Sequence, residues 1–253
     1  MVKDKIVVQN VNKCFNQRVK GKEVYALDVV NFSIKKGEFF VLLGPSGCGK
    51  TTLLNIMAGF ETPTTGKVLI DGKEVTAPDT RHVTMFQEHA LLPWRTVLYN
   101  VEYGLEMQDL EGEKKKKIVE KYLRLVGLEG SENLRPSEIS GGMKQRVQLA
   151  RTLAVNPDII FMDEPLGALD HFTRERLQKE LIDIWKKEKK TIVLITHNIT
   201  SAIMLADRIA VMSPLPGRIK RIIDVPIKRP RDRFSSKFIK IEKEIFNEFG
   251  INK

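Results

Sequence analysis

The stretch Gly44-Pro45-Ser46-Gly47-Cys48-Gly49-Lys50-Thr51 decides the fold, because it matches the pattern GxxxxGK followed by Ser or Thr. Its glycines let successive backbone N–H groups point inward, and these donors bind phosphate oxygens together with the N-terminus of the following helix. Lys50 places a positive charge on the β- and γ-phosphates, and the Thr51 hydroxyl is a ligand for Mg²⁺. We therefore predict that this loop, with the adjoining Thr52, binds ATP and Mg²⁺. The alternative is an ordinary glycine-rich turn.

The segments on either side of the loop have the character that such a loop requires, a strand before it and a helix after it. The apolar run 39–43 predicts a buried strand that leads into the loop. After the loop, Leu53, Leu54 and Met57 recur at helical spacing until Gly59. This context favours a phosphate loop over a plain turn.

Strand-like and helix-like segments alternate over the second half of the chain. Apolar runs at 159–162 and 191–196 predict buried strands, and amphipathic spacing at 177–185 and 199–206 predicts helices. The alternation indicates an α/β fold whose mainly parallel sheet is covered on both faces. Residues 1–43 are instead typical of short strands joined by turns.

Two adjacent carboxylates, Asp163 and Glu164, follow the apolar run 159–162. A carboxylate at the end of a buried strand is well placed beside a phosphate loop. We predict that Asp163 holds Mg²⁺ through water, and that Glu164 is the general base that polarises the attacking water.

A second anion-binding helix start is predicted at Ser140-Gly141-Gly142, which is followed by Met143-Lys144-Gln145-Arg146. A hydroxyl, free N–H groups and the positive end of a helix dipole favour an anion there. One chain already has its phosphate loop, so the second site needs an explanation of its own. Two chains arranged head to tail provide one, because each Ser-Gly-Gly then closes over the γ-phosphate held by the other chain.

With these motifs in this order, the sequence resembles an ABC transporter ATPase subunit from about residue 5 to residue 230. The segment 139–143 resembles the signature motif of that family, and 168–170, which ends at Asp170, resembles its D-loop. The resemblance implies that Gln87 touches Mg²⁺ and the attacking water, and that His197 contacts the γ-phosphate.

The same resemblance implies an aromatic side chain upstream of the loop that stacks on adenine. Phe15 is our candidate, and Tyr25 is the alternative. Stacking needs only the face of an aromatic ring, so phenylalanine is suitable.

The resemblance implies a single domain over 5–230 with a P-loop NTPase (RecA-like) core, a β-rich N-terminal subdomain and an inserted helical subdomain. The core takes 5–88 and 155–215, and the helical subdomain takes about 89–154. A basic C-terminal tail follows at 216–253.

The tail contains an amphipathic helix, for which Ser235 and Ser236 are the expected caps. Its apolar face is formed by Phe238, Ile241, Ile245 and Phe249. We expect this face to pack on the chain's own domain. The alternatives are a helix on the membrane surface or a contact with a partner.

Two stretches resemble one subgroup of this family, the importers of nitrate, sulfonate and taurine. One is Gln87-Glu88-His89-Ala90-Leu91-Leu92-Pro93-Trp94, and the other is Pro216-Gly217-Arg218-Ile219 followed by Lys228-Arg229-Pro230-Arg231. The resemblance implies three partners: a second copy of the chain in an ATP-dependent head-to-tail dimer, integral membrane permease subunits, and indirectly an extracytoplasmic solute-binding protein. Residues 88–105 would then receive a cytoplasmic helix of the permease, or they pack the helical subdomain. The transported solute stays open.

Bulk composition restricts the remaining classes. The apolar runs are too short to cross a bilayer and no leader pattern opens the chain, so we expect a cytoplasmic protein. The resemblance to importer subunits implies that it is peripheral, on the cytoplasmic face of the cell membrane. The two cysteines and four histidines predict neither a disulfide framework nor a metal-ligand spacing. The net charge of +10 fits a lysine-rich solvated surface or an anionic partner, so one rival is a soluble ABC ATPase acting on nucleic acid. We expect no nucleic-acid partner, because no groove-reading motif accompanies the charge. A P-loop kinase is a weaker rival, since it would not need the Ser-Gly-Gly motif.

Overall fold

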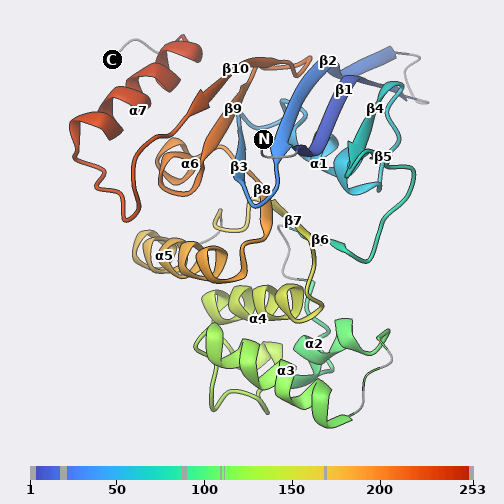
Figure 1. The fold of residues 1–253 in the computed structure, drawn as a ribbon, viewed down its shortest axis with the longest axis vertical. Helices are drawn as coiled ribbons and strands as arrows, with labels where there is room; N and C mark the ends of the chain where they lie inside the picture. The colour runs from blue at the N-terminus through green and yellow to red at the C-terminus, as the bar shows by residue number, and fades with distance from the viewer. Residues whose placement is uncertain are drawn as a thin grey trace. The chain divides into compact units, whose positions relative to one another are not determined.

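The computed structural model describes residues 4–17, 22–86, 90–108, 110, 112–167 and 170–250 (Figure 1). The chain divides into two compact units. Unit 1 comprises Met1–Asp79 and Lys190–Lys253, and unit 2 comprises Thr80–Lys189. Each unit is described by itself. The predicted boundaries of core, helical subdomain and tail differ from this division, and they stay a prediction.

The N-terminal part of unit 1 is an antiparallel sheet with the strand order β2-β1-β4-β5. Its strands are β1 (Asp4–Gln17), β2 (Lys22–Lys35), β4 (Thr65–Ile70) and β5 (Lys73–Glu74). The expectation of short strands before the loop was wrong, because β1 and β2 are 14 residues long.

The reason lies in bulges that interrupt the alternation of side chains along these two strands. The pairing of β1 with β2 shifts register between Val8 and Val11 and again near Lys13. Asn10 and Val29 have φ angles of 50° and 43°, in the left-handed region. A bulge adds one residue to one strand and reverses the face of those that follow, so a continuous strand has the sequence pattern of several short ones.

The second sheet of unit 1 has the strand order β10-β9-β3-β8. Its strands are β3 (Phe39–Leu43), β8 (Thr191–Thr196), β9 (Arg208–Met212) and β10 (Ile219–Asp224). β3 is parallel to β8 and β9, while β10 is antiparallel to β9. Every residue of β3 and β8 is buried, as expected for strands covered on both faces. The predicted α/β fold with a mainly parallel sheet is thus confirmed.

The described residues of unit 1 form the helices α1 (Lys50–Ala58), α6 (Ile199–Leu205) and α7 (Ser236–Glu248). α1 ends at Gly59, whose φ of 82° is left-handed. Ser235 caps α7, because its hydroxyl accepts a hydrogen bond from the Phe238 amide. The predicted end of α1 at Gly59 and the predicted cap of α7 at Ser235 are confirmed, whereas Phe249 of the predicted apolar face lies just beyond the last residue of α7.

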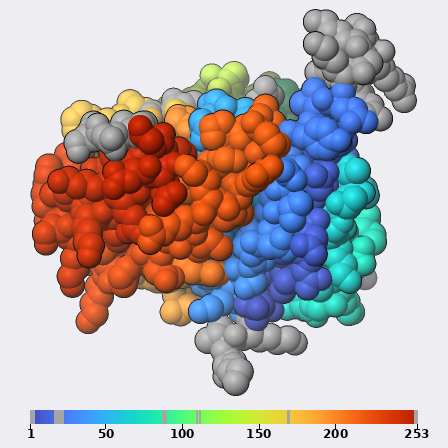
Figure 2. Space-filling view, turned by 90° about the horizontal axis from the view of Figure 1, so that it is seen from above, coloured from blue at the N-terminus to red at the C-terminus, as the bar shows by residue number. Residues whose placement is uncertain are grey.

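The C-terminal helix packs on its own unit. Phe238, Ile241 and Ile245 are buried, and α7 contacts α6. Arg221 of β10 forms ion pairs with Glu244 and Glu248 of the helix. Figure 2 shows the red C-terminal segment lying against the orange segments that precede it. The apolar face therefore has an intramolecular partner, as we expected.

Unit 2 contains two parallel strands, β6 (His82–Met85) and β7 (Ile159–Asp163), in register from His82 with Ile159 to Met85 with Met162. Its helices are α2 (Val97–Glu102), α3 (Gly112–Leu125), α4 (Gly141–Ala154) and α5 (His171–Glu188), with 3-10 turns at Tyr103–Leu105 and Pro136–Glu138. α4 contacts both α2 and α3.

Two polar side chains organise unit 2 from within. Asn100 is fully buried, and its amide bonds both the N–H and the carbonyl of Leu92, holding residues 92–96 against α2. Arg146 of α4 donates to the carbonyl of Val126 and pairs with Glu180 of α5 at 2.6 Å. Among the described helices, none is both long and apolar enough to cross a bilayer.

Candidate functional site

The glycine-rich loop of unit 1 holds its lysine inside its own turn. Lys50 is 5% exposed, and its ammonium donates to the carbonyls of Gly44 at 2.9 Å and Pro45 at 2.8 Å. The Cys48 sulfur lies 3.9 Å from the same nitrogen. The loop therefore places one fixed positive charge at its centre, where the oxygens of a phosphate are alternative acceptors.

The glycines of the loop satisfy two different requirements. Gly47 and Gly49 have φ angles of 77° and 96°, which L side chains rarely adopt. At Gly49 a Cβ atom would also lie 2.6 Å from the carbonyl oxygen of Ala26. At Gly47 nothing lies within 4 Å, so that face of the loop is open to a ligand.

The first turn of α1 is suited to an anion. Within the described chain no side chain caps this helix, and no acidic residue lies in its first turn. Helix N-termini have backbone N–H groups without a partner inside the helix, and the helix dipole is positive there. Thr51 is exposed and Thr52 half-buried on this turn. The loop and the helix start together can bind a polyphosphate.

His197 lies in the same unit, directly after β8. Leu43 at the end of β3 is in register with Thr196 at the end of β8, and the Gly44 amide donates to the Thr196 carbonyl at 3.4 Å. The exposed His197 therefore follows the strand that neighbours the start of the loop. The predicted association of His197 with the loop has this geometric support, and its role stays a prediction.

The β1–β2 hairpin carries both aromatic candidates for adenine. Phe15 is 38% exposed, and the Lys13 ammonium lies 4.8 Å from its ring centre. Tyr25 is 49% exposed and donates its hydroxyl to Glu23 at 3.0 Å, an interaction that raises the pKa of Tyr25. Phe15 presents a ring without a competing hydroxyl bond, so it stays our candidate for stacking.

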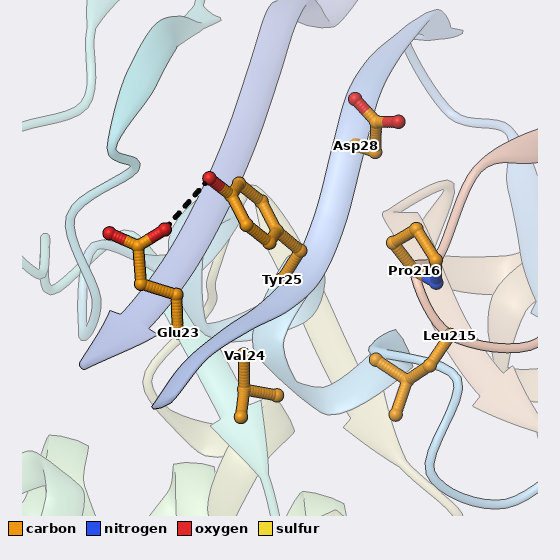
Figure 3. Close-up of a pocket in the computed structure, with 6 residues that line it drawn as sticks. All are labelled: Glu23, Val24, Tyr25, Asp28, Leu215 and Pro216. Carbon is orange, nitrogen blue, oxygen red and sulfur yellow. Dashed lines mark hydrogen bonds between the residues drawn. The ribbon is translucent and has the colours of Figure 1, made fainter. Parts of the chain in front are cut away.

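A pocket of about 520 Å³ lies on unit 1 between β2 and the turn that joins β9 to β10 (Figure 3). Glu23, Val24, Tyr25 and Asp28 line one side, and Leu215 and Pro216 line the other. The turn is held to β2 by two hydrogen bonds, from the Gly217 amide to Ala26 and from the Asp28 amide to Gly217, both 3.0 Å.

Gly217 lies outside the loop but packs against it, and our sequence reasoning missed this structural role. A Cβ atom at Gly217 would lie 2.2 Å from the carbonyl oxygen of Cys48. The turn that contains Gly217 therefore packs against the backbone of the phosphate loop at Cys48. In the sequence, Pro216-Gly217 predicts a turn and belongs to a stretch that resembles the importer subgroup, and nothing local relates it to residue 48.

In unit 2 the two predicted carboxylates lie at the end of β7. Asp163 is its last residue and is 8% exposed. Glu164 follows with a φ of 44°, and the Gly167 amide donates to its carbonyl at 3.0 Å. A left-handed φ at a non-glycine residue is costly and is concentrated at functional sites.

In unit 2, the helix start predicted to bind an anion lies close to the helix start at Asp170 of the predicted D-loop. Ser140 caps α4 by accepting from the Met143 amide at 3.3 Å, and Asp170 caps α5 by accepting from the Thr173 amide at 3.0 Å. The latter bond holds the pKa of the Asp170 carboxyl below its usual range. A Cβ atom at Gly142 would lie 3.1 Å from the Thr173 methyl group, so the two helix starts are neighbours.

The structure thus gathers the predicted residues into two groups. Unit 1 holds the loop, His197 and the aromatic candidates, and unit 2 holds Asp163, Glu164, Ser140, Gly141, Gly142 and Asp170. Gln87, and Ala168 and Leu169 of the predicted D-loop, lie outside the described residues. Among the described residues, no three His, Cys, Asp or Glu side chains gather as a metal site.

Comparison with known proteins gives consistent matches. A family model described as ABC transporter matches residues 27–167. The chain is 49% identical over 246 residues to an uncharacterized ABC transporter ATP-binding protein of Methanocaldococcus jannaschii, covering 97% of this chain and 91% of that protein. It is 49% identical over 221 residues to the taurine import ATP-binding protein TauB of Pelagibacter ubique, covering 87% and 83%.

Two further matches concern function and assembly. The chain is 41% identical over 244 residues to the aliphatic sulfonates import ATP-binding protein SsuB of Bacillus cereus, covering 96% of this chain and 95% of that protein. Among solved structures, a dimeric ATP-binding cassette in a post-hydrolysis state with ADP and Pi matches with a TM-score of 0.77 and 35% identity, covering 88% of this chain and 100% of that one.

Proposed function

The chain belongs to the ABC transporter family as an ATP-hydrolysing subunit, and on that premise we propose that it energises import of a small anionic solute of the sulfonate class through a separate membrane permease. The observation that carries ATP binding is the loop with its buried Lys50 and the uncapped start of α1. The sulfonate class is supported by the names of the relatives TauB and SsuB. These relatives give no support to an ATPase that acts on nucleic acid.

Within unit 1 each group has a role that follows from its chemistry. The loop amides of residues 44 and 46–49 and the first turn of α1 bind the phosphates, and Lys50 neutralises the β- and γ-phosphate oxygens. Phe15 stacks on the adenine, while His197 contacts the γ-phosphate from the end of β8. These assignments are supported by the open face at Gly47 and by the register of β8 beside the loop.

Magnesium fits the oxygen donors that this site offers. Mg²⁺ prefers one or two carboxylates or hydroxyls together with substrate phosphates and water. The Thr51 hydroxyl and the Asp163 carboxylate are donors of that kind, and Gln87 would be the third protein group. When bound, Mg²⁺ neutralises charge on the phosphate oxygens.

Hydrolysis needs a base near the γ-phosphate, and we assign that role to Glu164. Its carboxylate takes the proton from the attacking water as the oxygen bonds to the γ-phosphorus and the bond to the β-phosphate oxygen breaks. The left-handed turn at Glu164 supports a special orientation of this side chain.

A second copy of the chain completes the site in this proposal. Ser140, Gly141 and Gly142 of one copy face the γ-phosphate held by the other, with Asp170 at the start of the neighbouring helix. The adjacent starts of α4 and α5, and the match to a dimeric cassette with ADP and Pi, support this arrangement. ATP then holds the two copies together, and hydrolysis releases them.

The permease is proposed to dock on unit 2, at the cytoplasmic face of the membrane. The segment 94–107 exposes Trp94, Tyr99, Tyr103 and Met107, of which Trp94 is 71% and Met107 87% exposed. Exposed aromatic and methionine side chains are typical of protein interfaces. An extracytoplasmic binding protein would deliver the solute to the permease.

The central test uses Glu164→Gln, with Glu129→Gln as the matched control, because Glu129 pairs with Arg124 on the exposed surface. We expect Glu164→Gln to lower the ATPase rate by roughly a hundredfold or more while ATP still binds. Light scattering should then show an ATP-dependent dimer. A variant that turns ATP over normally, or that stays monomeric with saturating ATP, contradicts the assigned role.

The solute class needs the assembled transporter. The chain is reconstituted in proteoliposomes with the membrane subunits and binding protein encoded beside it, and ATPase activity is measured with taurine, methanesulfonate, nitrate and a neutral sugar. Stimulation by the two sulfonates supports the proposal. Stimulation by nitrate or by the sugar alone would place the chain with a different importer.

A further inference from the structure

The chain beyond β10 returns to α6 and closes the C-terminal end of that helix with two arginines. α6 has seven residues, and the last four carbonyls of any helix lack partners within it. Arg231 is 8% exposed, and its guanidinium donates to the carbonyls of Ile203 and Ala206, the latter at 2.7 Å. A residue read from the sequence as part of a basic tail is thus buried against a helix end.

The same guanidinium also holds the segment that carries it. Arg231 donates to the carbonyls of Val225 at 3.1 Å and Ile227 at 2.9 Å. We call residues 225–231 the strap. One planar side chain therefore joins four main-chain carbonyls, two in the strap and two at the end of α6, which a lysine ammonium with three donors cannot reproduce.

Arg229 extends this clamp to the first residue of β3, at the end of that strand away from the phosphate loop. It donates to the Leu205 carbonyl and pairs with Asp207 at 2.7 Å. The other oxygen of Asp207 accepts from the Phe39 amide at 3.0 Å, and the Asp207 amide donates to the Phe39 carbonyl at 2.7 Å. The strap is therefore connected with the start of β3, the strand that leads into the loop.

The strap adds to the packing that holds α6, because it supplies donors and positive charge at the C-terminal end of this short helix. A helix of two turns is marginal by itself, and cations at its C-terminus complement the helix dipole. Burial, and secondarily the charge of Arg229, lower the pKa of Arg231 to about 10, so the guanidinium is still protonated at neutral pH.

The N-terminal end of α6 lies next to the predicted catalytic His197, because the helix begins at Ile199 with Asn198 as its cap. The side-chain oxygen of Asn198 caps α6 by accepting a hydrogen bond from the Ser201 backbone amide at 2.7 Å, and the backbone N–H of Asn198 donates to the Thr196 hydroxyl at 3.0 Å. His197 thus lies between a strand fixed in the sheet and a helix whose far end is held by the strap. Ala202 and Ile203 are fully buried, so α6 transmits a displacement as a rigid element.

We propose that Arg231 is a positioning residue for ATP hydrolysis, which holds α6 so that His197 stays in place at the end of β8. This inference rests on the proposed function, in which His197 contacts the γ-phosphate. Loss of the clamp should lower the rate of hydrolysis and leave ATP binding by the loop unchanged, because Arg231 does not belong to the loop.

The experiment is a double-mutant cycle on the full chain with Arg231→Lys, His197→Ala and the pair. We expect His197→Ala to lower kcat by about a hundredfold, as loss of one transition-state donor does. Arg231→Lys should lower kcat by about tenfold with the Kd for ATP unchanged, since small displacements of a positioned group are costly. In the His197→Ala background, Arg231→Lys should have no further effect on kcat.

A matched control and a spectroscopic readout separate positioning from general destabilisation. Arg221→Lys weakens the exposed pairs between β10 and α7, which do not involve α6, and should leave kcat unchanged. In NMR spectra, the imidazole signal of His197, assigned from its absence in His197→Ala, should shift or broaden in Arg231→Lys while the other three histidine signals stay in place.

Several results overturn the proposal: an unchanged kcat in Arg231→Lys, a further loss in the His197→Ala background, or an ATP Kd that weakens in parallel. If Arg231→Lys does not fold, the cycle is repeated with Arg229→Lys, and a loss of folding there too assigns the strap a purely structural role. An unchanged kcat in His197→Ala instead contradicts the proposed function, so the two failures are distinguishable.

Discussion

Substitution of Gly217 by alanine should weaken ATP binding although this residue lies outside the loop. Gly217 has its amide and carbonyl bound to β2, at Ala26 and Asp28. The new Cβ atom would lie 2.2 Å from the Cys48 carbonyl oxygen, 3.0 Å from the Met212 methyl carbon and 3.2 Å from the Ala26 oxygen. Because two of the three neighbours are backbone atoms, no side-chain rotation relieves the clash.

The size of the effect follows from this contact. Ordinary van der Waals contact begins at 3.4 Å, so Gly217 or Cys48 must move by about 1.2 Å. Overpacking of this kind costs about 1–3 kcal/mol. The turn is held to β2 by two hydrogen bonds, so we expect the displacement to fall on Cys48 and the loop. ATP binding must then provide the free energy that returns the loop to its binding geometry. This cost raises the Kd for ATP by about tenfold to a hundredfold, since 1.4 kcal/mol corresponds to a factor of ten.

Isothermal titration calorimetry with Mg-ATP measures this Kd for the wild type and for Gly217→Ala. The matched control is Gly112→Ala, because Gly112 lies outside the left-handed region and a Cβ atom there meets nothing within 4 Å. The control should bind ATP like the wild type. A Gly217→Ala protein that binds ATP within about twofold of the wild type would refute the reasoning, even with a lower melting temperature, because the turn would then have absorbed the strain.

Three further predictions concern other parts of the molecule. Ser140→Arg should retain ATP binding by the loop but abolish hydrolysis, measured by calorimetry and phosphate release, because in the proposed two-chain site Ser140 acts on the nucleotide of the other copy; normal turnover excludes that site. Arg208→Met should lower the free energy of unfolding by about 3 kcal/mol, because it leaves the buried Glu38 carboxylate without its ion-pair partner at 2.5 Å. Arg218→Met removes the exposed pair with Asp28 and should lower it by less than about 1 kcal/mol. Urea titrations measure both values, and equal losses contradict the reasoning. Burial raises the pKa of the Cys48 thiol above 9.0, so the unfolded chain releases this proton first and the free energy of unfolding should fall as the pH rises past that value. Cys48→Ala should therefore lose less stability than the wild type between about pH 7 and about pH 10, and identical losses count against the assignment.

Features that depend on near neighbours in the chain were predictable from the sequence. The loop at 44–51 with its strand and helix, the stop at Gly59 and the cap at Ser235 all follow from residues a few positions apart. Their backbone angles and hydrogen bonds are decided within one or two turns, so a local pattern carries the information.

The two long N-terminal strands show where local pattern fails. The left-handed residues Asn10 and Val29 carry no glycine to mark the interruption. The strands continue through the bulges because their pairing partners hold them on both sides, and that is a property of the sheet.

Arg231 and Gly217 show the same limit at the candidate site. In the sequence, Arg231 is one of several basic residues in a tail, and a basic run is most often a solvated surface. Only the fold buries its guanidinium against α6 and places Gly217 behind Cys48.

The sequence by itself therefore determined the chemistry at residues 44–51, because a phosphate loop is built from eight consecutive residues whose backbone does the binding. The tertiary structure decided which distant residues support that loop and the helix after His197. At the loop, the contact between Gly217 and Cys48 joins segments separated by more than 150 residues. Such contacts arise because side chains must pack and buried carbonyls need hydrogen-bond donors. No local periodicity in the sequence contains that information.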